Sequence, residues 1–77
     1  MHAHDPVRDL VRMANQIAGY FQSYPPEEAV AETAGHIRNF WEPRMRRRLH
    51  EHVEAGGEGL HEIALQAVGR LKAPQNA

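Results

Sequence analysis

The chain has 77 residues and a formal net charge of −1, so we expect one small domain with a thin core and no charge-driven preference for nucleic acid or membranes. It contains no Cys, which excludes disulfides and cysteine-ligated zinc sites. No apolar run approaches the length of a membrane span, and the N-terminus lacks the basic and apolar regions of a signal peptide. We therefore expect a soluble, cytoplasmic protein.

The composition favours helices throughout. Ala, Leu, Glu, Arg and Gln are plentiful and no segment alternates like a strand, so the sequence predicts an all-α fold, a small bundle of three to four short helices. The helices are expected at about 5–23, 26–41, 43–55 and 60–71. Residues 5–72 would form a single helical domain, between a flexible N-terminus at 1–4 and a flexible tail at 73–77.

The first two helices begin at prolines. Asp5 is suited to the N-cap of the first and Pro6 to its first helical position. Apolar residues then recur at helical spacing on one stripe, at Val7, Leu10, Val11, Ala14, Ile17, Ala18 and Phe21. Tyr24-Pro25-Pro26 ends this helix and opens the second, whose first turn carries Glu27 and Glu28, favourable for the helix dipole.

Two adjacent aromatic residues close the second helix. Its main stripe ends on Trp41, whereas Phe40 lies roughly 100° round the helix. Because the two side chains cannot point the same way, Trp41 is assigned mainly to the core, and Phe40 must either widen that core or face something else. Pro43 disfavours helix at Glu42 and suits the first position of the third helix.

The second half of the chain has narrower apolar stripes. The third helix presents Met45, Leu49 and Val53, and the glycine-rich residues 56–59 then form a link predicted to be flexible. The stripe of the fourth helix consists of Leu60, Ile63, Ala64, Ala67 and Leu71, with Leu65 and Val68 outside it. The pattern leaves open whether this helix packs back on the first three.

Neither metal binding nor catalysis is favoured. His50 and His52 diverge by roughly 200° on a helix; His50 and Glu54 could share an ion, but the HExxH signature is absent. No nucleophile–base pair, glycine loop after a strand or carboxylate pair stands out. We predict no catalytic, cofactor-binding or metal-ligating residue in this chain.

Two binding functions remain open. The run Arg44–Arg48 suits phosphate contact, which would make the chain a small helical nucleic-acid-binding or regulatory protein. A solvated helix face with partial Glu pairing is the simpler explanation, and the acidic balance of the chain argues against nucleic-acid binding. Alternatively, Met13, Tyr20, Phe40 and Leu65 exceed what a thin core absorbs, which indicates a partner-binding subunit or a self-associating module.

Several stretches together resemble a known family. They are Leu10-Val11-Arg12-Met13-Ala14-Asn15-Gln16-Ile17-Ala18 with Phe21, His36-Ile37 with Phe40-Trp41-Glu42-Pro43-Arg44-Met45-Arg46, and Leu49 with Gly56-Gly57 and Gly59-Leu60. This ordered set, which spans most of residues 7–60, resembles the delta subunit of the soluble NAD-dependent, molybdenum-containing formate dehydrogenases.

The resemblance implies a non-catalytic accessory subunit. In such a complex, formate is oxidised to CO2 and NAD+ is reduced, with the molybdenum–pterin, iron–sulfur and FMN cofactors in the larger subunits. The delta subunit is expected to bind the molybdenum-containing subunit and to support its assembly, cofactor loading or stability. The lack of Cys for a cluster agrees with a role without redox chemistry.

The motif residues that lie largely off the apolar stripes are the predicted partner-binding set: Arg12, Asn15, Gln16, His36, Phe40, Trp41, Arg44 and Arg46. Asn15 and Gln16 in particular have no evident core role, and Trp41 could serve both core and partner. A mixed aromatic, amide and Arg surface can pair with the backbone and carboxylates of another protein. The expected partners are the larger formate dehydrogenase subunits, with self-association of the isolated chain as a further possibility, and neither nucleic acid nor membrane.

Overall fold

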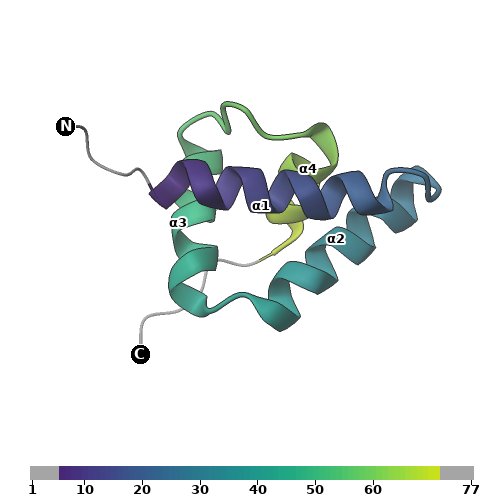
Figure 1. Cartoon of the computed structure of the whole chain (residues 1–77), viewed down its shortest axis with the longest axis horizontal. Helices are drawn as coiled ribbons and strands as arrows, with labels where there is room; N and C mark the ends of the chain where they lie inside the picture. Colours follow the sequence, from purple (N-terminus) through teal and green to yellow (C-terminus); the bar gives the residue numbers. More distant parts are fainter. Residues whose placement is uncertain (1–5, 72–77) are drawn as a thin grey trace.

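The computed structural model describes residues 6–71 and contains four α-helices in this part of the chain (Figure 1). They are α1 (Pro6–Phe21), α2 (Pro26–Phe40), α3 (Pro43–Glu54) and α4 (Glu62–Arg70). The all-α prediction is confirmed. Two boundaries were placed too far out, since α1 ends at Phe21 rather than Ser23 and α4 begins at Glu62 rather than Leu60. The predicted N-cap Asp5 and both predicted flexible ends lie outside the described residues.

Prolines set the starts of α2 and α3. Pro26 and Pro43 each occupy the first helical position, where a missing N–H costs no hydrogen bond. Between them, Trp41 and Glu42 are both extended, with ψ of 142° and 153°. An extended residue before a proline is what steric contact with the proline ring favours. The chain therefore turns sharply between α2 and α3, and the turn begins at Trp41.

Helix α1 (purple in Figure 1) lies across the bundle and contacts the other three helices. The main core cluster draws on all four helices and the α2–α3 turn: Leu10, Ala14, Ala18, Ile37, Trp41, Leu49, Ala64 and Val68. Five alanines of the described residues are fully buried, at 14, 18, 29, 64 and 67. Small side chains at these positions let the helix axes approach closely, as ridge-into-groove packing allows.

Helix α4 packs back onto the other three, which answers the question that the sequence left open. Val68, predicted outside its apolar stripe, is only 2% exposed. The prediction was wrong because α4 is inserted between α1, α2 and α3, so more than one of its faces is covered. Leu65, the other residue placed outside the stripe, is half-buried beside Gly57.

The glycine-rich link is a defined hydrogen-bonded turn. The Gly57 N–H donates to the His52 carbonyl over 2.9 Å, and the Gly56 N–H donates to that of Val53 over 3.0 Å. This is the Schellman pattern of helix C-termini, in which the residue after the C-cap takes positive φ, here Gly56 at 125°; Gly57 also has positive φ, of 68°. The turn directs the chain back towards α1, where α4 begins. None of the helices within residues 6–71 is long and apolar enough to cross a membrane.

Candidate protein-binding site

A largely apolar groove of about 680 Å³ lies where α1 faces the end of α2 and the start of α3. Its walls are formed by Met13, Gln16, Ile17, Tyr20, Phe21, His36, Phe40, Trp41 and Met45. No acidic side chain from residues 6–71 lines this groove. The predicted residues Gln16, His36, Phe40 and Trp41 are thus brought together, although they come from two helices and a turn.

The two adjacent aromatic residues have opposite environments. Phe40 is 73% exposed, whereas Trp41 is 6% exposed and belongs to the core cluster. The His36 ring lies against Phe40, with 4.7 Å between the ring centroids. Trp41 was placed in both the core and the partner-binding set; in this structure it offers a partner only the small part of its ring that reaches the groove. Phe40 offers most of its surface.

The residues that α1 contributes to the groove also include aromatic side chains. Tyr20 is 73% exposed, and its ring meets Phe21 edge-on at 4.9 Å between centroids. Phe21 in turn contacts Tyr24, which is 40% exposed. The predicted set omitted Tyr20, Phe21 and Met45, although Tyr20 had been counted among the surplus apolar residues. Their link to Phe40 depends on how α1 crosses α2, which periodicity along one helix does not reveal.

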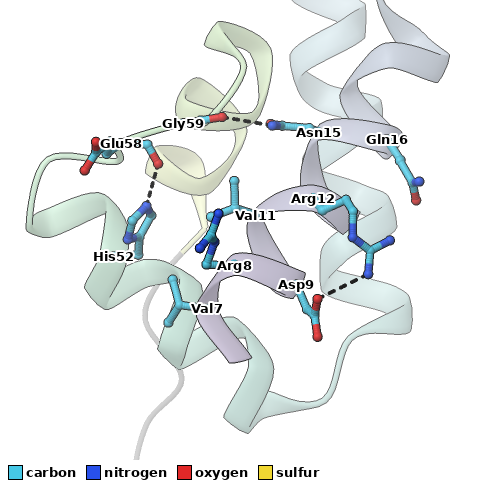
Figure 2. Close-up of a pocket in the computed structure, with 10 residues that line it drawn as sticks. All are labelled: Val7, Arg8, Asp9, Val11, Arg12, Asn15, Gln16, His52, Glu58 and Gly59. Carbon is cyan, nitrogen blue, oxygen red and sulfur yellow. Dashed lines mark hydrogen bonds and ion pairs between the residues drawn. The ribbon is translucent and has the colours of Figure 1, made fainter. Parts of the chain in front are cut away.

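A second, more polar hollow of about 1120 Å³ lies on the other side of Gln16, between the first half of α1 and the loop after α3 (Figure 2). The predicted residues Arg12 and Asn15 line this hollow rather than the groove. Arg12 Nη2 is 3.3 Å from Asp9 Oδ1 on the same helix, and the pair is exposed. The predicted partner-binding residues of α1 are therefore divided between two hollows that share Gln16.

Asn15 has a clear internal role, contrary to the expectation that it had none. Its Nδ2 donates to the Gly59 carbonyl over 2.9 Å, as Figure 2 shows, and its Oδ1 accepts from the His61 N–H over 2.8 Å. His61 Nδ1 then accepts from the Ile63 N–H over 3.0 Å and caps α4. Asn15 thereby ties α1 to the start of α4, and partner contact is not needed to explain it.

We expect Asn15→Ala to lower the free energy of unfolding by about 2 kcal/mol, because two backbone groups in the loop lose their partner. Thermal melting followed by circular dichroism measures this effect. Gln16→Ala is the matched control, since the Gln16 side chain is exposed and makes no hydrogen bond within residues 6–71. This variant should change stability by no more than about 0.5 kcal/mol. Equal melting temperatures for the two variants would contradict the assignment of Asn15 to the fold.

The arginines at the α2–α3 turn differ in role. Arg46 Nη1 donates to the Trp41 carbonyl over 2.8 Å and to the Arg38 carbonyl over 3.3 Å, so it satisfies acceptors at the end of α2. Arg44 is exposed, and its side chain makes no hydrogen bond or ion pair within residues 6–71. Of the two predicted partner-binding arginines at this turn, Arg46 therefore stabilises the turn and Arg44 is available to a partner.

Within the described residues, no group of three His, Asp or Glu side chains is placed to hold a metal. His50 Nδ1 and Glu54 Oε2, the pair considered from the sequence, are 3.6 Å apart and form an i,i+4 ion pair when His50 is protonated. The groove presents mainly aliphatic and aromatic side chains, together with the polar side chains of Gln16 and His36. Such a lining is suited to hold side chains of another protein.

The fold and the groove together define a small helical protein with an exposed aromatic binding surface, typical of a subunit that associates with others. The family model described as NADH-dependent formate dehydrogenase delta subunit FdsD matches residues 9–68. The chain belongs to this family, which confirms the resemblance found in the sequence and implies association with other formate dehydrogenase subunits. No curated protein and no solved structure matches the chain.

Proposed function

We propose that this chain is a non-catalytic accessory subunit that binds the molybdenum-containing subunit of an NAD-dependent formate dehydrogenase and supports its assembly, cofactor loading or stability. The observation that carries the proposal is the groove with Phe40 and Tyr20 at its edges, each 73% exposed. Large aromatic side chains in contact with water are unfavourable in a free subunit and dominate binding energy once a partner covers them.

The chemistry is assigned to the larger subunits. They would hold the molybdenum–pterin cofactor, the iron–sulfur clusters and FMN, and would pass electrons from formate to NAD+. This chain has no Cys to ligate a cluster. Its proposed contribution is a binding surface that keeps the molybdenum-containing subunit in a state able to accept or retain its cofactor.

Co-expression of this chain, tagged, with the larger subunits tests the proposal. After affinity purification, the expected result is co-purification of the molybdenum-containing subunit. When the chain is left out, either molybdenum per catalytic subunit or the thermal stability of that subunit should fall. Recovery of the tagged chain alone, together with full molybdenum content and stability in its absence, would overturn the proposed function.

Phe40→Ala should weaken binding to the catalytic subunits by tenfold or more, since truncating a central aromatic residue of an interface costs about 2 kcal/mol. The dissociation constant can be measured by surface plasmon resonance with the purified chain and delta-free catalytic subunits. The control is Gln66→Ala on α4, an exposed residue that does not line the groove. A Phe40→Ala variant that binds as tightly as the Gln66→Ala variant would move the interface away from this groove.

A further inference from the structure

Positive charge is concentrated beside the groove. Residues 36–48 contain more than half of the nine Lys and Arg residues of the chain, although its net charge is −1. The five basic residues are Arg38, Arg44, Arg46, Arg47 and Arg48. Glu42 is the one acidic residue of the segment 36–48. The same segment supplies His36, Phe40, Trp41 and Met45 to the groove.

Arg44 and Arg48 are not neutralised within the described part of the chain. Its arginine ion pairs lie elsewhere, between Arg12 and Asp9 and between Arg70 and Glu27. Arg44 and Arg48 are both exposed, and neither guanidinium group makes a hydrogen bond or an ion pair within residues 6–71. Because they are four residues apart on α3, they face the same side and repel each other slightly, so the isolated fold gains nothing from this pair.

These two arginines flank the α3 residue of the groove. Arg44 precedes Met45 in the first turn of α3, and Arg48 lies one turn further along the same side of the helix. An extended or helical segment bound in the groove would therefore lie close to these two guanidinium groups where it extends beyond the apolar lining. Guanidinium groups bind carboxylates through two parallel hydrogen bonds, which gives both energy and direction.

We infer that the groove receives an acidic amphipathic segment of the partner subunit, with apolar side chains between Phe40 and Tyr20 and with Asp or Glu side chains on Arg44 and Arg48. This inference rests on the proposed function and adds the chemistry of the bound segment. A second copy of the chain fits less well, because a two-fold symmetric contact through this surface would place the arginines of both copies close together. Nucleic acid would satisfy the arginines but leave Met13, Ile17 and Met45 without apolar partners.

Charge reversal at Arg44 and Arg48 tests the proposed pairing of these arginines with acidic side chains of the partner segment. Arg44→Glu places an acidic residue in the first turn of a helix, which the helix dipole tolerates, so folding should be retained. We expect Arg44→Glu and Arg48→Glu each to weaken binding to the purified catalytic subunits by about tenfold at low salt, and less at high salt. The matched control is Arg8→Glu, which makes the same charge change at an exposed arginine of the second hollow. The Arg8 side chain has no ion pair within residues 6–71. The affinity of this variant should stay within about twofold of the wild-type value.

Photo-crosslinking identifies the segment. With benzoylphenylalanine in place of Phe40 in the purified complex, the crosslinked peptide should come from the molybdenum-containing subunit and should contain both apolar residues and Asp or Glu. Changing those acidic residues to Lys should restore the affinity of Arg44→Glu.

Several outcomes would overturn the inference. These are a crosslink to a second copy of this chain, a captured segment without acidic residues, and wild-type affinity of both Glu variants. Competition for the groove by a DNA or RNA oligonucleotide at physiological salt would instead assign the arginines to phosphate binding. If Phe40→Ala weakens the complex while both Glu variants bind normally, the proposed function stands and only the acidic segment is wrong. Failure of the wild-type chain to bind the catalytic subunits at all would overturn both.

Discussion

Replacing Trp41 by Ala is expected to unfold most of the isolated chain, whereas replacing its neighbour Phe40 leaves the fold nearly unchanged. Trp41 is 6% exposed and packs in the main core cluster, at the turn that joins α2 to α3. Truncation of a buried Trp costs about 3–5 kcal/mol. A single core in a chain of this size rarely supplies more than about 3–5 kcal/mol of stability. Phe40 is 73% exposed, so its truncation should change stability by about 0.5 kcal/mol or less.

Far-UV circular dichroism during urea denaturation measures both variants. Tryptophan fluorescence cannot be used for the comparison, because Trp41 is the only Trp in the chain. Trp41→Phe serves as a control that retains an aromatic side chain and should recover part of the lost stability. A Phe40→Ala variant that unfolds as readily as Trp41→Ala would show that Phe40 belongs to the core, and the groove would lose its main exposed anchor.

The contrast between these two residues was predictable from the sequence because it depends on local rules. The stripe that ends on Trp41 and the 100° step between adjacent helical positions assign the pair to different faces. Proline chemistry likewise predicted where α2 and α3 begin, at Pro26 and Pro43. Helix boundaries and helix faces depend on residues that are only a few positions apart in the chain, so a single sequence is enough to predict them.

The role of Asn15 could not be predicted in this way. Its two hydrogen bonds reach residues 44 and 46 positions further along the chain. A polar residue off the apolar stripe has the same appearance in the sequence whether it meets a partner or another part of its own fold. Arg46 shows the same difficulty at shorter range, since its bonds to the Arg38 and Trp41 carbonyls depend on the direction of the turn.

The groove was only partly predictable. The sequence indicated an excess of aromatic surface and named Phe40 and Tyr20, but it did not show that both line one hollow. That arrangement follows from the angle between α1 and α2, which in turn depends on close packing through small buried residues such as Ala14 and Ala18. The angle between two packed helices depends on both of them, so it cannot be predicted from the periodicity of either helix alone.

Replacing Gly57 by Ala should be more damaging than replacing Gly59, which lies in the same loop after α3. Gly57 has φ of 68°, a left-handed conformation that costs an L-residue about 1–2 kcal/mol. A Cβ there would also overlap Leu65 Cδ2, so the half-buried Leu65 would have to move. Overpacking of this kind adds about 1–3 kcal/mol. We therefore expect a loss of about 2–4 kcal/mol, which in a chain of this size lowers the melting temperature by roughly 10–25 °C.

Gly59→Ala separates the two causes. Gly59 also has positive φ, of 85°, but the nearest atom to its added Cβ is Val11 Cγ1 at 3.7 Å, an ordinary contact. It should therefore lose only the conformational part, about 1–2 kcal/mol. In a Leu65→Ala background, the cost of Gly57→Ala should fall to the same value, because the overlapping methyl group is gone. Equal losses for Gly57→Ala and Gly59→Ala in the wild-type background would show that Leu65 yields without cost. The seating of α4 on the loop would then depend on Asn15 and His61 rather than on the contact between Leu65 and Gly57.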